Sequence, residues 1–170
     1  MSTAIAPALS RNQIERLTDN IRKQFNCNDC YFDIVSFVEV VLPAIDPTFN
    51  YEYVSSDELT PGMYAYYDPS SNTMKILSSV YERACDDIGR DRFTIAHEVG
   101  HYFLHQEGYS FARTNSEIPT YCNPEWQANT FASTLLIPKR QTKTMSIEEI
   151  RDKCKVSYQA AEIAYTRNWQ

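Results

Sequence analysis

The sequence predicts an α+β protein in which a small antiparallel sheet of about three strands packs with a helical bundle. Helical spacing of apolar residues occupies residues 10–42 and returns after residue 91. The stretch 48–77 is rich in aromatic and β-branched residues around a turn, a composition typical of strands. With 170 residues, the chain has the length of one compact domain.

Two helices are expected first. Ser10 and Gln13 have the spacing of a capping box, and they predict a helix from Ser10 to Phe25. The segment Asp33–Leu42 is more apolar, and we expect it to form the second helix. Pro43 should stop this helix, because proline has no backbone N–H for a helical hydrogen bond.

Strands are expected in the middle of the chain. Met63–Tyr67 and Thr73–Leu77 flank the turn sequence Asp68-Pro-Ser-Ser-Asn72, which predicts a hairpin. Phe49–Val54 has aromatic residues at alternate positions and is the third expected strand. Because Thr73–Leu77 leads toward the next helix, we expect it to offer a sheet edge to an extended peptide.

The next two helices have recognisable ends. One is expected from Asp91 to Gln106, and an irregular connection follows it. The other should begin at Asn123, which can cap it, with Pro124 in the first helical position. Pro138 should end this second helix, because the chain cannot continue helical hydrogen bonding through it.

The last part of the chain, residues 146–169, is expected to form two short helices in the outline of a helix-turn-helix. We therefore divide the chain into a domain at 1–140 and a small helical tail at 141–170. A DNA-binding helix needs clustered Lys and Arg. Because residues 157–170 contain only Arg167 of these types, packing or docking of a partner is the favoured role of the tail.

All three histidines of the chain fall within the helix expected at 91–106. His97 and His101 are one turn apart on one face, so both imidazoles can reach a single ion. Glu98 lies on the adjoining edge, where it can contact a water rather than the ion. This spacing is typical of zinc hydrolases. The alternative is histidines that only pack, but the helix is otherwise apolar, and buried polar groups need partners.

Two histidines leave a catalytic zinc one protein ligand short. A third histidine six residues after His101 is absent, because position 107 is Glu. His105 is one turn beyond His101, where three ligands in a row on one helix converge poorly. We therefore expect His105 to be a hydrogen-bonded histidine beside the centre rather than a ligand.

A downstream carboxylate is the remaining source of a third ligand, and Glu107, Glu117 and Glu125 are the candidates. Helical periodicity places only Glu125 on a core-facing stripe, which needs a polar partner. Asn129, one turn later, shares this face and could orient a ligating imidazole. The other members of the stripe are small or apolar: Ala128, Ala132 and Leu136.

Three motifs occur together in this chain. The first is Arg92-Phe-Thr-Ile-Ala followed by His97-Glu-Val-Gly-His101. The second is Glu125-x-x-Ala-Asn-x-Phe-Ala, and the third is Leu135-Leu-Ile-Pro138. From about residue 48 onward the sequence resembles the ImmA/IrrE family of metallopeptidases, which are gluzincin-like.

The resemblance implies a zinc endopeptidase that cleaves helix-turn-helix (Xre-like) repressors of phages, mobile elements or stress regulons. It implies Zn²⁺ as cofactor, with His97, His101 and Glu125 as ligands and Glu98 as the general base. Gln127 and its neighbour Trp126 stand where many members have a further acid, so only one carboxylate is offered there.

The group that would stabilise the oxyanion is not identified by any motif, and Tyr109 and Tyr121 are the candidates. The alternative function is a binding partner that sequesters a repressor without cutting it. That role is less favoured, because binding alone needs no general base. A DNA-binding regulator is disfavoured by the net charge of −6, so we expect no direct contact with nucleic acid.

Composition also sets the expected compartment. No run of about 18 apolar residues occurs, so no membrane association is expected. Five cysteines without an export signal indicate free thiols in a reducing cytoplasm. Cys27 and Cys30 form a lone CxxC, and without a second pair at zinc-ribbon spacing we expect inert thiols.

Overall fold

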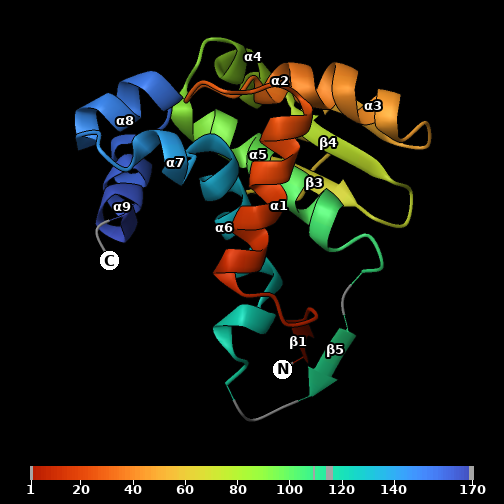
Figure 1. Cartoon of the computed structure of the whole chain (residues 1–170). Helices are drawn as coiled ribbons and strands as arrows, with labels where there is room; N and C mark the ends of the chain where they lie inside the picture. The colour runs from red at the N-terminus through yellow and green to blue at the C-terminus, as the bar shows by residue number, and fades with distance from the viewer. Residues whose placement is uncertain (1, 109, 114–116, 169–170) are drawn as a thin grey trace.

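The protein has two long central helices with a small sheet on one side and short helices on the other (Figure 1). The computed structural model describes residues 2–108, 110–113 and 117–168. The central helices are α5 (Gly89–Leu104) and α6 (Pro124–Leu136), which pack closely together. The first long helix, α1 (Arg11–Gln24), packs on α6. The predicted α+β class is confirmed.

The N-terminal helix begins as predicted. Ser10 is the N-cap of α1, and its hydroxyl accepts a hydrogen bond from the backbone N–H of Gln13. The Gln13 side chain in turn accepts from the Ser10 backbone N–H at 2.8 Å, which completes the capping box. These two bonds satisfy donors that the first turn of a helix leaves without partners.

The second helical segment does not stop at Pro43, as the sequence had predicted. It continues from α2 (Ile34–Ser36) through a π turn, η1 (Phe37–Val41), into α3 (Leu42–Ile45). The Leu42 backbone N–H bonds to the carbonyl of Phe37, five residues back. This wider turn displaces the preceding carbonyls from α-helical positions, and Pro43 then occupies the first turn of α3, where no N–H is needed.

The three-stranded sheet is mixed, which corrects the prediction of a purely antiparallel one. The strands β3 (Ala65–Asp68) and β4 (Thr73–Leu77) form the predicted antiparallel hairpin. Strand β2 (Asn50–Val54), however, pairs parallel to β4, so the order is β2-β4-β3. Alternating residues predict a strand but do not identify its neighbours, because both pairings present the same side chains to the core.

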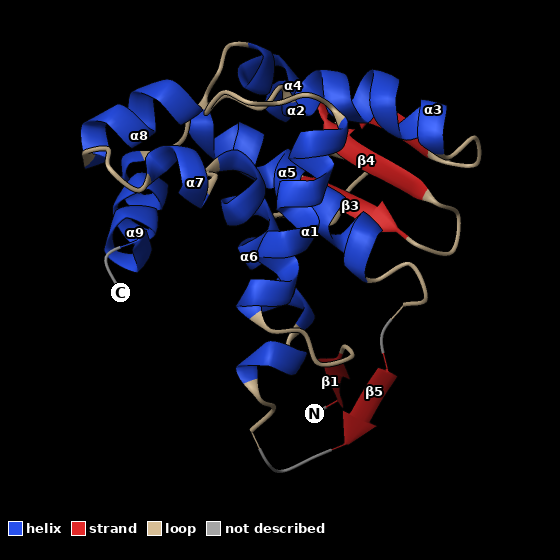
Figure 2. Cartoon of the chain, viewed as in Figure 1, coloured by secondary structure: helices blue, strands red, loops and turns tan. Residues whose placement is uncertain are grey.

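The central position of β4 also corrects the expectation that this strand offers an edge. Its backbone groups pair with β2 on one side and β3 on the other. The strand with an unpaired side toward α5 is β3. Figure 2 shows β3 and β4 beside the helices, well separated from the strands β1 and β5.

Several short elements were not predicted from the sequence. Strands β1 (Ser2–Ile5) and β5 (Ser110–Arg113) form a separate antiparallel pair. The helix α4 (Ser78–Cys85) follows β4 directly, and the 3₁₀ turn η2 (Thr120–Cys122) precedes α6. Elements this short have too few residues to show a period, so their position depends on tertiary contacts.

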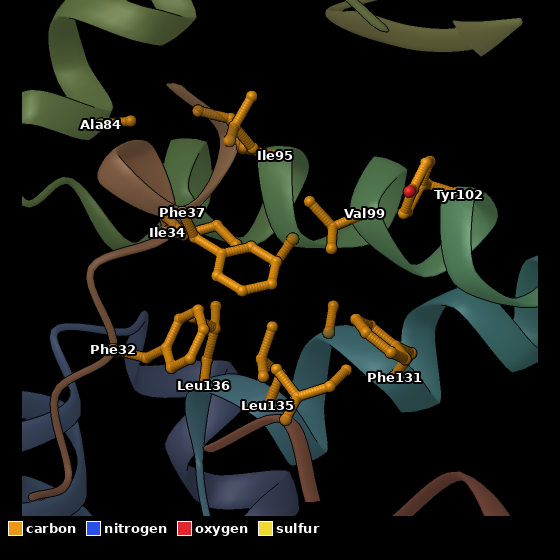
Figure 3. Close-up of a cluster of buried hydrophobic side chains, with 14 of the residues drawn as sticks. Phe32, Ile34, Phe37, Ala84, Ile95, Val99, Tyr102, Phe131, Leu135 and Leu136 are labelled. Atoms are coloured by element: carbon orange, nitrogen blue, oxygen red, sulfur yellow. The ribbon is translucent and has the colours of Figure 1, made fainter. Parts of the chain in front are cut away.

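The core between α5 and α6 determines how the two helices face each other. Figure 3 shows Phe131 and Leu135 of α6 on one side of α5 and Ile95 on the other, and the ring of Phe103 in α5 stacks on Phe131 with the ring centres 5.6 Å apart. The backbones approach closely, because a Cβ on Gly100 would lie 3.1 Å from the Cα of Ala128. Small residues at a helix crossing allow this approach. As a result, the polar residues at one end of both helices come within bonding distance.

The C-terminal tail forms two short helices, as predicted. They are α8 (Ile147–Cys154) and α9 (Tyr158–Asn168), and α7 (Lys139–Thr142) precedes them. Ser146 caps α8 with the predicted capping box. Several tail residues belong to the same hydrophobic core as α5 and α6; they are Ile150, Cys154, Val156, Ala161 and Ala164. The domain boundary at residue 140 stays a prediction. Among the described helices, none has the length and apolarity to cross a bilayer.

We expect Gly89→Ala to destabilise the protein, because α5 begins against the junction of α8 and α9. A Cβ on Gly89 would lie 2.4 Å from the carbonyl carbon of Val156 and 2.5 Å from the backbone nitrogen of Ser157. The backbones would have to move apart, at a cost of about 2 kcal/mol. Urea unfolding measures this loss, with Asn20→Ala on exposed α1 surface as the control. An unchanged midpoint for Gly89→Ala would contradict the contact.

Candidate metal centre

His97 and His101 form one side of the centre, on successive turns of α5. Their Nε2 atoms lie 3.0 Å apart, and their rings meet edge to face. Both rings project from one helix face because residues four apart are separated by about one turn. Two unprotonated ring nitrogens at this distance repel each other, so the pair requires a proton or a cation between them.

Glu125 forms the other side, from the first turn of α6. Its position is set by Asn123, whose side chain accepts hydrogen bonds from the backbone N–H groups of Glu125 and Trp126. The Glu125 carboxylate oxygens lie 3.2 Å from Nε2 of His97 and 3.4 Å from Nε2 of His101. The structure thus brings together the three residues that the sequence analysis proposed as ligands.

The electrostatics of these three groups fit a bound cation. Hydrogen bonds from His101 and His97 hold the pKa of the Glu125 carboxyl well below its usual range. Burial lowers the pKa of His97, but its contacts with Glu125 and Glu98 outweigh burial and raise it overall. Two imidazole nitrogens and a carboxylate oxygen, all within 4.8 Å of one another, are a donor set that zinc prefers. The residues therefore fit the ion.

Asn129 orients His97, one turn after Glu125 on α6. Nδ1 of His97 lies 2.9 Å from Oδ1 of Asn129. An amide oxygen only accepts hydrogen bonds, so Nδ1 of His97 carries the proton in the neutral ring. The Nε2 lone pair then faces the centre, which is the tautomer that a metal ligand needs.

His101 is oriented through a longer chain of hydrogen bonds. Its Nδ1 lies 3.0 Å from Nδ1 of His105, and Nε2 of His105 lies 2.8 Å from Oε1 of Gln127. The Gln127 amide nitrogen donates to the carbonyls of Pro7 and Tyr121, both at 2.8 Å, so Oε1 must face His105. His105 then donates from Nε2 and accepts at Nδ1, and His101 directs its Nε2 lone pair to the centre.

His105 is suited to this role because it stays neutral. It is only 3% exposed, and burial is the main cause that lowers its pKa to about 4. His105 is thus the hydrogen-bonded residue beside the centre that the sequence analysis expected. This role of Gln127 was not predicted from the sequence, in which the residue stood out only as a position without an acid. Its signal was a polar residue one turn before the buried Phe131, a position that needs hydrogen-bond partners.

Glu98 lies outside this donor cluster and is bound to the sheet. Its Oε2 accepts a hydrogen bond from the backbone N–H of Tyr67 in β3 at 2.8 Å. The side chain is buried, and burial raises the pKa of the Glu98 carboxyl against the opposing effect of His101 and His97. A carboxylate with a raised pKa beside a metal centre is a suitable general base.

The other candidate residues do not join the centre. Glu107 and Glu117 are exposed, and neither belongs to the donor cluster. Tyr121 is 51% exposed in η2, and its carbonyl, not its phenol, is the group that contacts Gln127. Tyr109 lies outside the described residues. The group that would stabilise an oxyanion therefore stays unassigned.

The fold and the centre together have the features of a class of metallopeptidases in which a helix with the sequence His-Glu-x-x-His meets a glutamate from the following helix. The chain belongs to the Peptidase_M78 family, described as the IrrE N-terminal-like domain, whose model matches residues 58–166. This match covers more than half of the chain and includes every residue of the centre except the Pro7 carbonyl.

A search of the curated proteins finds no match. Among solved structures, a Mycobacterium tuberculosis transcriptional regulator is similar, with a TM-score of 0.57 and 13% sequence identity. The similarity covers 88% of this chain and 45% of that protein, so the chain spans less than half of its length. At this identity, the similarity shows a shared fold alone.

Proposed function

We propose that the protein is a zinc-dependent endopeptidase that cleaves and thereby inactivates a helix-turn-helix transcriptional repressor. The observation that carries the proposal is the convergence of His97, His101 and Glu125, with Glu98 buried beside them. A binding module needs neither an oriented histidine pair nor a carboxylate with a raised pKa. The side chain of Glu125 is 64% exposed, so a polypeptide can approach the centre from solvent.

The residues divide the chemistry of peptide hydrolysis between them. His97, His101 and Glu125 would hold the zinc ion, which would supply Lewis acidity to the scissile carbonyl and to the attacking water. Glu98 takes a proton from the attacking water while the water oxygen bonds to the carbonyl carbon. When the C–N bond breaks, Glu98 gives this proton to the leaving amine. The Tyr67 N–H holds one Glu98 oxygen and leaves the other for the proton.

The edge of β3 is where an extended substrate would pair. In the antiparallel hairpin, the Tyr64 carbonyl accepts from Leu77, whereas the Tyr67 N–H is directed at Glu98. Along an edge strand, the backbone N–H and C=O groups of successive residues point alternately toward the neighbouring strand and away from it. Ala65 and Tyr67 are two residues apart, so both direct these groups to the open side of β3. A peptide added here would lie next to Glu98, and its main chain would be held by hydrogen bonds.

Resemblance to the ImmA/IrrE family supports a repressor as the substrate. A repressor bound to DNA in a phage, a mobile element or a stress regulon places the proposed activity in the cytoplasm. The alternative, sequestration without cleavage, has the same partner and is separated from proteolysis by experiment.

The test is to incubate the purified protein with the repressor encoded beside its gene, in the presence of Zn²⁺ or of a chelator. We expect discrete repressor fragments with zinc, none with chelator, and about one zinc bound per chain by elemental analysis. Intact repressor that co-elutes with the protein in gel filtration would instead support sequestration. Intact repressor with no complex would contradict both.

A further inference from the structure

A groove of about 710 Å³ lies beside the metal centre, between α5, α6 and α9. Its walls include Arg90 and Phe93 of α5, Trp126 and Asn129 of α6, and Ile163 of α9. The proposed chemistry uses none of this space. The helical tail, for which the sequence analysis favoured packing or partner docking, supplies one wall.

The groove adjoins the centre. Asn129 lines it and holds Nδ1 of His97 at 2.9 Å. Trp126 follows Glu125 directly, so the same turn of α6 serves both the centre and the groove. Along α5, Phe93 lies one turn and Arg90 two turns before His97 on the same face. A peptide whose scissile bond lies at the centre therefore has its neighbouring residues in this groove.

Among the described residues, the lining combines large apolar side chains, neutral hydroxyl and amide groups and positive charges, and it contains no acidic side chain. Phe93, Trp126 and Ile163 are the large apolar residues, and Ile163 is 59% exposed. Arg11 and Arg90 are the charged residues among those described along the groove, whereas the chain as a whole has a net charge of −6. The Arg11 guanidinium lies 5.8 Å from the centre of the Trp126 ring.

A third guanidinium adds to this positive field. Arg167 of α9 donates to the hydroxyl of Ser133, which lines the groove. In the part of the chain that the structure describes, its Nε and Nη2 are buried and have no hydrogen-bond partner. Burial and the nearby Arg11 lower the pKa of Arg167, and Glu15 partly offsets them. A carboxylate that enters the groove would relieve this repulsion.

We propose that this groove is a specificity site that binds the substrate segment next to the scissile bond and selects an apolar residue flanked by acidic ones. The inference rests on the proposed peptidase function and names the class of peptide that the enzyme prefers. Arginine pairs with carboxylates through two parallel hydrogen bonds, and the apolar walls bury the side chain between them. Nucleic acid fits less well, because its phosphates leave the apolar walls without a partner and are repelled by the rest of the protein.

Binding can be measured without turnover, in the Glu98→Gln protein. Trp169→Phe makes Trp126 the single tryptophan, and its fluorescence then reports occupancy of the groove. The probes are two synthetic peptides that differ only in charge: Leu-Phe flanked by Glu pairs, and Leu-Phe flanked by Lys pairs. We expect the Glu peptide to bind about tenfold more tightly, and the difference to shrink in high salt.

Charge reversal makes the test decisive. In Arg11→Glu/Arg90→Glu, the preference should invert toward the Lys peptide, and in the milder Arg11→Gln/Arg90→Gln it should disappear. Lys139→Glu/Arg140→Glu, which makes the same change in net charge on α7 away from the groove, should keep the wild-type preference. Equal binding of both peptides, or tighter binding of a thymidine oligonucleotide, would overturn the inference. Because no cleavage is needed, this failure is distinct from a failure of the peptidase proposal.

Discussion

Glu98→Gln is expected to lower kcat/KM for repressor cleavage about 10²–10⁴-fold while zinc binding stays unchanged. The amide is almost the same size as the carboxylate, and its oxygen can still accept the hydrogen bond from the Tyr67 N–H at β3. It cannot take a proton from water, so the attack on the carbonyl loses its base. Glu98 also lies outside the donor cluster, so the ligands remain in place.

The comparison variant for this experiment is His101→Ala, which should lose both zinc and cleavage because it removes a ligand. Elemental analysis gives the zinc content, and fragment formation over time gives the rate. If Glu98→Gln cut the repressor at the wild-type rate, Glu98 would not be the general base. If it lost zinc as completely as His101→Ala, its role would be structural.

Gln127→Leu should weaken zinc binding about 10–100-fold, although Gln127 touches none of the three ligands. Leucine has no acceptor for the hydrogen bond from Nε2 of His105, so the tautomer that carries its proton on Nε2 is no longer stabilised. His105 can switch its proton to Nδ1, where it opposes the Nδ1 proton of His101. In a fraction of molecules, His101 would then carry its proton on Nε2, the nitrogen that faces the centre. Zinc must displace this proton in order to bind.

Gln127→Glu separates the two functions of this side chain. A carboxylate still accepts from His105, so zinc affinity should stay within a few-fold of wild type. It cannot donate to the carbonyls of Pro7 and Tyr121, so the free energy of unfolding should fall by about 1–3 kcal/mol. Competition with a chromophoric chelator measures the affinity, and ¹⁵N NMR of the imidazoles reports the tautomers. Equal zinc affinity in Gln127→Leu and wild type would contradict the relay.

Local signals predicted the helices that carry the centre, for a physical reason. A capping box or a proline acts within one turn of the helix, so the end of a helix can be predicted from a few adjacent residues. The start of α1 at Ser10 and the bounds of α6, between Asn123 and Pro138, follow from such signals. Periodicity also placed His97 and His101 on one face of α5.

The errors lie where local signals compete or are absent. Pro43 should break a helix, because its ring clashes with the carbonyl of the preceding turn. The π turn before Pro43 removes this clash, and no residue pattern predicts such a turn. The parallel pairing of β2 with β4 depends on how the connection crosses the sheet, not on the residues of either strand. The pairing of the short strands β1 and β5 likewise depends on tertiary contacts, because each segment forms a strand only by bonding to the other.

The residues of the donor cluster could be predicted from the sequence alone, because their identities and their places along two helices follow from motif and period. The tertiary structure was needed to show that Gln127, fixed by the carbonyls of Pro7 and Tyr121, is linked to His101 through His105. It also decided that α9 walls a groove beside the centre. Both features join segments that are far apart in the chain, and such contacts depend on packing in three dimensions, which no local pattern of residues encodes.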